Sequence, residues 1–251
     1  LTTERIFGVP LGVSAGFVFL FVLFGSLLDK AGAGEYFINL AFSMLGKYRG
    51  GSAKASIIAS GFMGIMSGSS IANTVTTGTF TIPLMKRTGF RAEQAAAVEV
   101  SASSNGQLMP PVMGAAAFIM AEFLGMAYTD VVIAAFIPAF VAYFGLFYII
   151  HLEALKLGLK GMDDEDIPPK WKTFIQGIHY LIPIMFLLYT LVVLRESAAS
   201  AAFNAIMLLM VLMVVQHPFR AILAKEKLTR DIWLSGFVDI LAGMISGAKN
   251  M

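Results

Sequence analysis

Two long apolar segments between residues 60 and 126 are each interrupted by a short, polar, uncharged stretch. The first interruption is centred on Ser67–Ser70, and the second runs from Ser103 to Pro111. Such stretches are ordinary in a soluble protein, but in a bilayer each backbone group without a hydrogen bond costs several kcal/mol. The meaning of these interruptions therefore depends on whether the chain lies in a membrane.

The composition indicates a membrane protein. Hydrophobic residues make up 57% of the chain, charged residues make up 14%, and the mean hydropathy is +0.77, whereas soluble domains carry about 25% charged residues. Several apolar runs reach the roughly 20 residues that a bilayer-spanning helix needs. Cysteine is absent, which excludes disulfides and thiol chemistry. The small net charge of +2, with basic residues in membrane-flanking loops, predicts no nucleic-acid partner.

The apolar pattern predicts an all-α polytopic membrane protein in four parts. Residues 1–51 hold a first span and an interfacial arm helix, and residues 52–126 hold the interrupted region. Residues 127–232 hold further spans and cytoplasmic loops, and residues 233–251 begin another apolar segment. Because the chain starts at Leu1 and stops inside that segment, we expect a piece of a longer membrane protein.

Segment length predicts the shape of the interrupted region. One straight helix over residues 52–85 would measure about 50 Å, which exceeds the roughly 30 Å hydrocarbon core. Because Ser67–Ser70 splits this segment, we predict a re-entrant helical hairpin that enters and leaves on one side. Residues 91–126 are also too long for one simple span. The polar stretch that ends in Pro110 and Pro111 predicts a transmembrane helix broken near mid-membrane.

The basic residues support the hairpin independently of its length. If the hairpin returns to the face it entered and every other span crosses once, most basic residues share one side. Of the 18 Lys and Arg residues, only Arg5, Arg195 and Lys249 then fall elsewhere. The positive-inside rule makes the shared side cytoplasmic. A full crossing by residues 52–85 would separate the basic turns that flank it.

A helix broken inside a membrane leaves carbonyl groups unpaired at the end of one half and N–H groups unpaired at the start of the other. Carbonyls and neutral hydroxyls suit a partly dehydrated cation such as Na⁺, and helix N-termini suit an anion such as a carboxylate. A single Ser or Thr in such a break can merely satisfy a kinked backbone. Two paired breaks, however, are typical of a transporter binding site.

Glu99 lies one helical turn before Ser103, so both can face the same site. An intramembrane carboxylate is a candidate functional group by default. Here it can carry a proton, bind a cation or stabilise the break. The sequence contains no Ser-His-Asp arrangement, no HExxH and no Walker A motif, so we predict neither an enzyme nor ATP-driven transport.

Two long motifs carry a family resemblance. Residues 67–87 read SGSSIANTVTTGTFTIPLMKR, and residues 99–122 read EVSASSNGQLMPPVMGAAAFIMAE. Both resemble the large membrane subunit of tripartite ATP-independent periplasmic (TRAP) transporters. The NTVTTGTF and GQLMPP wording is most similar to the branch with fused small and large permease subunits.

The resemblance implies a sodium-driven secondary transporter for organic anions, such as C4-dicarboxylates and other carboxylates. It implies two protein partners, which are an extracytoplasmic solute-binding protein and a small membrane subunit, and a multi-pass location in the cytoplasmic (inner) membrane of a bacterium or archaeon. It also implies an elevator-type fold of two inverted repeats, each with a hairpin and a broken helix. This chain would hold one repeat and the start of the second. Apart from Na⁺ as coupling ion, no cofactor is implied.

The resemblance also implies a sodium site between the hairpin tip and the second break, with the anion beside it. The expected sodium-site residues are Ser69, Ser70, Asn73, Ser103, Ser104, Asn105 and Gly106. The expected substrate-binding residues are Thr76, Thr77 and Pro110, and the candidate coupling carboxylate is Glu99. Two alternatives stay open. One is a proton-coupled transporter that uses this carboxylate, and the other is a channel or membrane scaffold without a coupled cycle.

Overall fold

The computed structural model describes residues 8–223 and 230–250. Every regular element in these ranges is a helix. Four helical stretches are long and apolar enough to cross a membrane, and these are Leu11–Lys30, Tyr128–Lys156, Asp164–Val193 and Ala198–Pro218. The predicted class, an all-α polytopic membrane protein, is therefore confirmed. Arg5, Lys225 and Lys227, which entered the charge argument, lie outside the described ranges.

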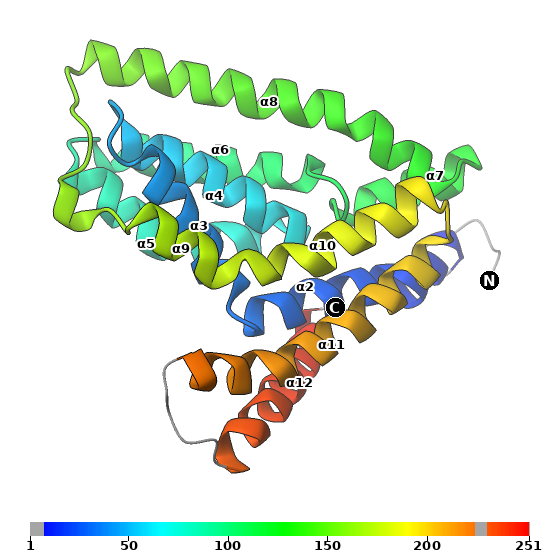
Figure 1. Ribbon diagram of the computed structural model, residues 1–251. Coiled ribbons are helices and arrows are strands. Elements are labelled where there is room, and N and C mark those ends of the chain that lie inside the picture. The colour runs from blue at the N-terminus through cyan, green and yellow to red at the C-terminus, as the bar shows by residue number, and fades with distance from the viewer. Residues whose placement is uncertain (1–7, 224–229, 251) are drawn as a thin grey trace. The chain divides into compact units, whose positions relative to one another are not determined.

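The chain divides into two compact units, and Figure 1 labels helices that belong to them. Unit 1 contains residues 1–33, 115–130 and 179–251, and unit 2 contains residues 34–114 and 131–178. The elements of unit 1 are α1 (Val9–Val13), η1 (Ser14–Val18), α2 (Phe19–Lys30), α7 (Ala115–Leu124), η4 (Ile178–Tyr180), α10 (Leu181–Leu188), η5 (Tyr189–Val193), α11 (Ala198–Leu223) and α12 (Arg230–Asn250). The elements of unit 2 are α3 (Ala33–Leu45), α4 (Gly51–Ser67), α5 (Ser70–Arg87), α6 (Ala92–Asn105), η2 (Gly106–Leu108), most of α8 (Tyr128–Lys156), η3 (Asp164–Asp166) and α9 (Lys170–Gly177).

Helices α4 and α5 form the predicted hairpin. Helix α4 ends at Ser67 and is followed by Gly68, whose φ of 57° lies in the left-handed region that glycine adopts without a Cβ clash. Ser69 then caps α5, because its hydroxyl accepts a hydrogen bond from the Ala72 N–H at 3.3 Å. The chain thus reverses direction, and the two helices pack along each other. The pair of antiparallel helices is therefore present, and its re-entry on one side of a membrane stays a prediction.

The second polar interruption breaks a helix, as predicted. Helix α6 ends at Asn105 and is followed by one tight turn, η2, and then by irregular backbone over residues 109–114. Pro110 and Pro111 lie in this irregular stretch, where neither can donate a backbone N–H. The break therefore leaves carbonyl groups at the end of α6 without helical partners.

Side chains of α4, α5, α6 and α8, together with Phe90 from the loop between α5 and α6, form a core in unit 2. The buried members are Ala53, Ile57, Met85, Phe90, Ala95, Val98, Ala102, Ile150 and Ala154. From α8, the Tyr143 hydroxyl donates a hydrogen bond to the Ala102 carbonyl at 2.9 Å. The Lys54 ammonium of α4 lies 2.9 Å from His151 Nδ1 of α8. Helix α8 therefore contacts α4 and α6 through these side chains, and the alanines let α4 and α6 approach each other closely.

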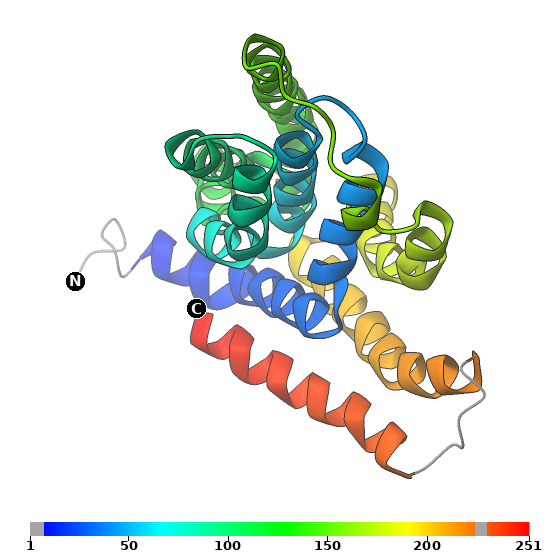
Figure 2. The same ribbon diagram turned by 90° about the vertical axis from the view of Figure 1, so that its left-hand side faces the viewer.

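In unit 1, helix α12 runs along α2 (Figure 2). Two glycines four residues apart make this close approach possible. A Cβ atom built on Gly243 would lie 3.1 Å from Leu27 Cα, and one built on Gly247 would lie 3.2 Å from Leu23 Cα. Both distances are shorter than ordinary van der Waals contact, so the interface tolerates little beyond a hydrogen at these positions.

We therefore expect Gly243→Leu in the full-length protein to weaken the α2–α12 contact by about 1–3 kcal/mol, as overpacking does in well-packed interiors. The measurement is the thermal unfolding midpoint of the detergent-purified protein. Ala248→Leu, on an exposed position of the same helix, is the matched control and should leave the midpoint unchanged. Equal midpoints for both variants would argue against the close α2–α12 packing.

Candidate functional site

Glu99 is the most deeply enclosed charged side chain of the interrupted region. It lies on α6, is 0% exposed, and accepts hydrogen bonds from four hydroxyl groups. Oε1 accepts from the hydroxyls of Ser60 at 3.0 Å, of Ser103 at 3.2 Å and of Thr77, and Oε2 accepts from the Thr81 hydroxyl at 2.5 Å. A buried carboxylate without such partners would be very costly. The four hydroxyls thus explain how this side chain can be enclosed.

The donors reach Glu99 from three helices, α4, α5 and α6. Thr77 and Thr81 are four residues apart on α5 and therefore share one face, as Glu99 and Ser103 do on α6. Gly78 lets α5 come close, because a Cβ built there would lie 3.2 Å from Glu99 Cγ. The ion pairs of the described residues do not include Glu99. Its partners are therefore neutral, and they tie both hairpin helices to the broken helix.

Asn73 connects this network to the break. Its side chain is buried, and Nδ2 donates a hydrogen bond to the Ser60 carbonyl at 2.9 Å. A Cβ built on Gly106 would lie 3.0 Å from the same nitrogen. The Thr77 hydroxyl lies 2.8 Å from the Asn73 carbonyl as well as beside Glu99. Since a hydroxyl has one proton, it donates to only one of these acceptors at a time.

The hairpin tip, which is the turn at Gly68 and Ser69 with the adjoining helix ends, lies directly against the break, which begins after Asn105. A Cβ built on Gly64 would lie 2.5 Å from Gly106 Cα, and one built on Gly68 would overlap the Met113 carbonyl oxygen. The Gln107 amide donates a hydrogen bond to the Ser70 hydroxyl at 3.0 Å. Two polar helix ends, at the tip and at the break, thus meet in unit 2.

The predicted site residues fall into three groups. The buried ones are Asn73, Thr77, Ser103, Gly106 and Pro110, the half-buried ones are Ser69, Ser70 and Asn105, and the exposed ones are Thr76 and Ser104. Thr76 and Thr77 are adjacent in sequence, but about 100° of helix rotation separates them, so only Thr77 faces Glu99.

Ser60 and Thr81 are the residues that the sequence analysis missed. Both donate hydrogen bonds to the Glu99 carboxylate. For Thr81 a signal existed, because it follows Thr77 by four residues on a predicted helix. For Ser60 the only signal was the need of a buried carboxylate for several donors.

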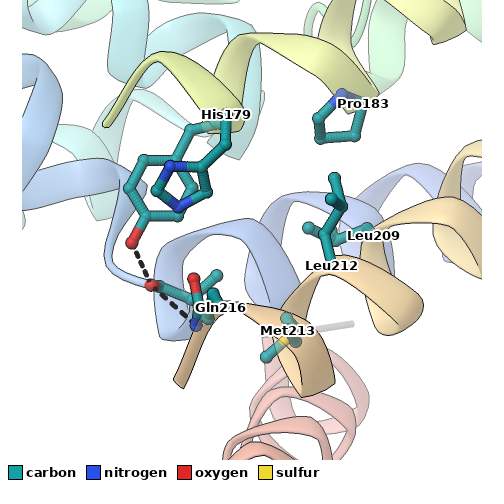
Figure 3. Close-up of a pocket in the computed structure, with 8 residues that line it drawn as sticks. His179, Pro183, Leu209, Leu212, Met213 and Gln216 are labelled. Carbon is teal, nitrogen blue, oxygen red and sulfur yellow. Dashed lines mark hydrogen bonds between the residues drawn. The ribbon is translucent and has the colours of Figure 1, made fainter. Parts of the chain in front are cut away.

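A crevice in unit 1 does not belong to this site. Figure 3 shows its lining, which comes from the end of α2, from η4 and α10, and from α11. The Ala31 carbonyl accepts hydrogen bonds from the Tyr180 hydroxyl at 2.6 Å and from the Gln216 amide at 3.4 Å. The crevice leaves no room for a water molecule. We therefore interpret it as a packing contact that fixes the C-terminal end of α2.

Comparison with known proteins identifies a protein family that this chain matches. A family model described as the DctM component of tripartite ATP-independent periplasmic transporters matches residues 1–246. The C4-dicarboxylate TRAP transporter large permease protein DctM of Rhodobacter capsulatus is 35% identical over 91 residues, which are 36% of this chain and 21% of the relative. The 2,3-diketo-L-gulonate TRAP transporter large permease protein YiaN of Escherichia coli is 23% identical over 193 residues, which are 74% of this chain and 44% of the relative.

A third relative is the isethionate TRAP transporter permease protein DctMQ of Oleidesulfovibrio alaskensis. It is 34% identical over 91 residues, which are 36% of this chain and 14% of the relative. The chain thus spans between 14% and 44% of the lengths of these three relatives.

Proposed function

The chain belongs to the DctM family of TRAP transporter large permeases, and from this premise we propose that it forms part of a sodium-coupled permease for organic anions. An extracytoplasmic solute-binding protein delivers the anion. A small membrane subunit, separate or fused in the full-length chain, completes the complex. The location is the cytoplasmic membrane of a bacterium or archaeon, and the transported species binds and leaves without chemical change.

The observation that carries this proposal is the contact between the hairpin tip and the break. The close approach of Gly64 to Gly106 brings the end of α4 next to the end of α6. Helix C-termini present carbonyl oxygens that have no helical partner. In a membrane protein, paired broken elements of this kind bind ions and substrates. A scaffold would have no need for two polar helix ends in one place.

We place the sodium ion at the edge of this contact. The proposed ligands come from Ser69, Ser70, Ser104, Asn105 and Gly106, because hydroxyl, amide and carbonyl oxygens suit a hard cation. Asn73 and Ser103 belong to the same region, but their side chains already donate hydrogen bonds to the Ser60 carbonyl and to Glu99. In the proposal they hold the ligands in position.

We propose a small carboxylate or a related organic anion as the substrate. The names of the three relatives mention a C4-dicarboxylate, 2,3-diketo-L-gulonate and isethionate, which are all small organic anions. The N-terminal end of a helix favours an anion, and α5 begins at the hairpin tip. The anion would lie toward Thr76 and Pro110, and Thr77 would contribute from behind.

Proton coupling through Glu99 is the second candidate function. The observation in its favour is the complete burial of a carboxylate in a membrane protein, since such groups act as proton relays in pumps and transporters. This mechanism predicts uptake that follows a pH gradient and persists without sodium.

One uptake experiment separates these functions. The full-length permease is reconstituted into liposomes with its solute-binding protein, and uptake of radiolabelled C4-dicarboxylates, sugar acids and sulfonates is measured. We expect uptake of one class to require inward-directed sodium at fixed pH and to saturate with substrate. Uptake that persists without sodium but needs a pH gradient would replace the first proposal by the second. Unsaturable flux that needs no binding protein would indicate a channel.

A further inference from the structure

The hydrogen bonds that the Glu99 carboxylate accepts argue against a direct role of this residue in binding the ion. An ionised carboxylate offers about four lone-pair sites on its two oxygens. The hydroxyls of Ser60, Thr77 and Ser103 crowd around Oε1, and the Thr81 hydroxyl donates to Oε2. A sodium ion at Oε1 would have to displace at least one of these donors, and an ion at Oε2 would have to reach a side chain that is 0% exposed. Thr77 could turn to the Asn73 carbonyl at 2.8 Å. Thr81 and Ser103 have no second acceptor within the described ranges, so either hydroxyl, once displaced, would be buried and unpaired, which is unfavourable.

The position of Glu99 along α6 also argues against direct binding of the ion. Gly106, at the break, follows Glu99 by seven residues, which is about 10 Å along a helix axis. The carboxylate is therefore set back from the hairpin tip. Any influence of Glu99 on an ion at the tip has to pass through other residues.

A continuous set of contacts provides that path. The Ser60 hydroxyl donates a hydrogen bond to Glu99 Oε1 at 3.0 Å, and the Ser60 carbonyl accepts a hydrogen bond from the Asn73 amide at 2.9 Å. The same amide nitrogen lies against Gly106, 3.0 Å from where a Cβ of that residue would be. Rotation or loss of the Glu99 side chain would release Ser60, and then Asn73, from their present positions.

We propose that Glu99 is a positioning residue of the ion site, an inference that rests on the proposed function. It holds the hairpin tip against the break by accepting hydrogen bonds from both hairpin helices and from its own helix. It neither carries the coupling proton nor binds the sodium ion. The distance between tip and break, and with it the affinity for sodium, depends on this carboxylate.

The proposal predicts a characteristic order of substitutions. In Glu99→Gln the amide oxygen still accepts hydrogen bonds, and hydroxyl groups near the new NH₂ can turn and accept from it. Glu99→Ala removes the acceptor of all four hydroxyls and leaves a cavity. Glutamine should therefore preserve the tip-to-break distance, and alanine should not. A group that must ionise or bind the cation would fail with glutamine as well.

The test uses the reconstituted full-length permease with its solute-binding protein. Uptake is measured against sodium concentration and between pH 6 and 8. Glu93→Gln is the matched control, because this residue is an exposed carboxylate on the same helix. We expect Glu99→Gln to retain the wild-type pH profile and a half-saturating sodium concentration within about threefold of wild type. We expect Glu99→Ala to raise that concentration by tenfold or more, which corresponds to about 1.4 kcal/mol.

A second readout does not depend on transport. Ser70→Cys and Gln107→Cys are introduced together, with any other cysteine of the full-length protein replaced, because these side chains meet across tip and break at 3.0 Å. A short thiol-specific cross-linker should join them in the otherwise wild-type and Glu99→Gln backgrounds, and much less in Glu99→Ala. This comparison still decides the role of Glu99 if Glu99→Ala is too unstable to transport, or if the wild type turns out not to use sodium.

Three results would overturn the inference. Loss of uptake in a well-folded Glu99→Gln protein would show that the charge itself is needed. A pH profile that flattens in Glu99→Gln would identify a proton carrier. Equal cross-linking in wild type and Glu99→Ala would show that Glu99 does not hold the tip. A wild-type protein without sodium dependence would instead contradict the proposed function, whatever the cross-linking shows.

Discussion

Replacing Gly64 with leucine is expected to abolish uptake and to reduce the folded permease in the membrane. Gly64 lies where the hairpin tip meets the break. A Cβ at this position alone would lie 2.5 Å from Gly106 Cα and 2.8 Å from its carbonyl oxygen. Those neighbours are backbone atoms, so no side-chain rotation can relieve the clash. Overpacking of a tight interior costs about 1–3 kcal/mol and sometimes more, and here it also separates the two elements of the proposed ion site.

Gly145→Leu is the matched control for Gly64→Leu. It makes the same change in α8, where a Cβ would have no atom within 4 Å. Membrane level and uptake should remain close to wild type in this control. A Gly64→Leu protein that reaches normal levels and transports normally would show that the tip and the break do not approach each other as described.

The fold of the interrupted region was largely predictable, because simple physical limits act on it. Residues 52–85 are too long for one span, and the Gly68–Ser69 turn lies where the polar break was predicted. Pro110 and Pro111 excluded a continuous helix through the second segment. The grouping of helices into two units had no comparable signal. In a membrane protein both faces of a helix can be apolar, so periodicity does not reveal which face packs against which neighbour.

The candidate site was predictable as a place but not as a set of contacts. The polar residues of the two breaks do meet, as the contact between Ser70 and Gln107 illustrates. The sequence could not distinguish Thr76 from Thr77, because the choice depends on the rotation of α5 against α6. It also gave no link between Glu99 and Ser60, which is 39 residues away in the chain. Contacts of this length arise from packing, and no local pattern records them.

Asn105→Leu is expected to abolish sodium-driven uptake while leaving the amount of folded permease unchanged. Asn105 is the last residue of α6, is half-buried, and has no side-chain hydrogen bond within the described ranges. Leucine is similar in size and favours the helix more than asparagine does. The substitution therefore removes an amide oxygen, which the proposal assigns to sodium, without removing a contact that stabilises the fold.

Thermal unfolding with and without sodium separates these two effects. A ligand that binds only the folded state stabilises it by RT ln(1 + [L]/Kd), which is about 2.7 kcal/mol at a hundredfold excess over Kd. Sodium should therefore raise the Tm of the wild type but not that of Asn105→Leu, while both share one Tm without sodium. Ser101→Leu, an exposed polar-to-leucine change one turn earlier on α6, should keep the sodium response. Because a stability defect would lower both Tm values of Asn105→Leu, only loss of an ion ligand fits a change confined to the sodium response. A full sodium response in Asn105→Leu would remove this residue from the site.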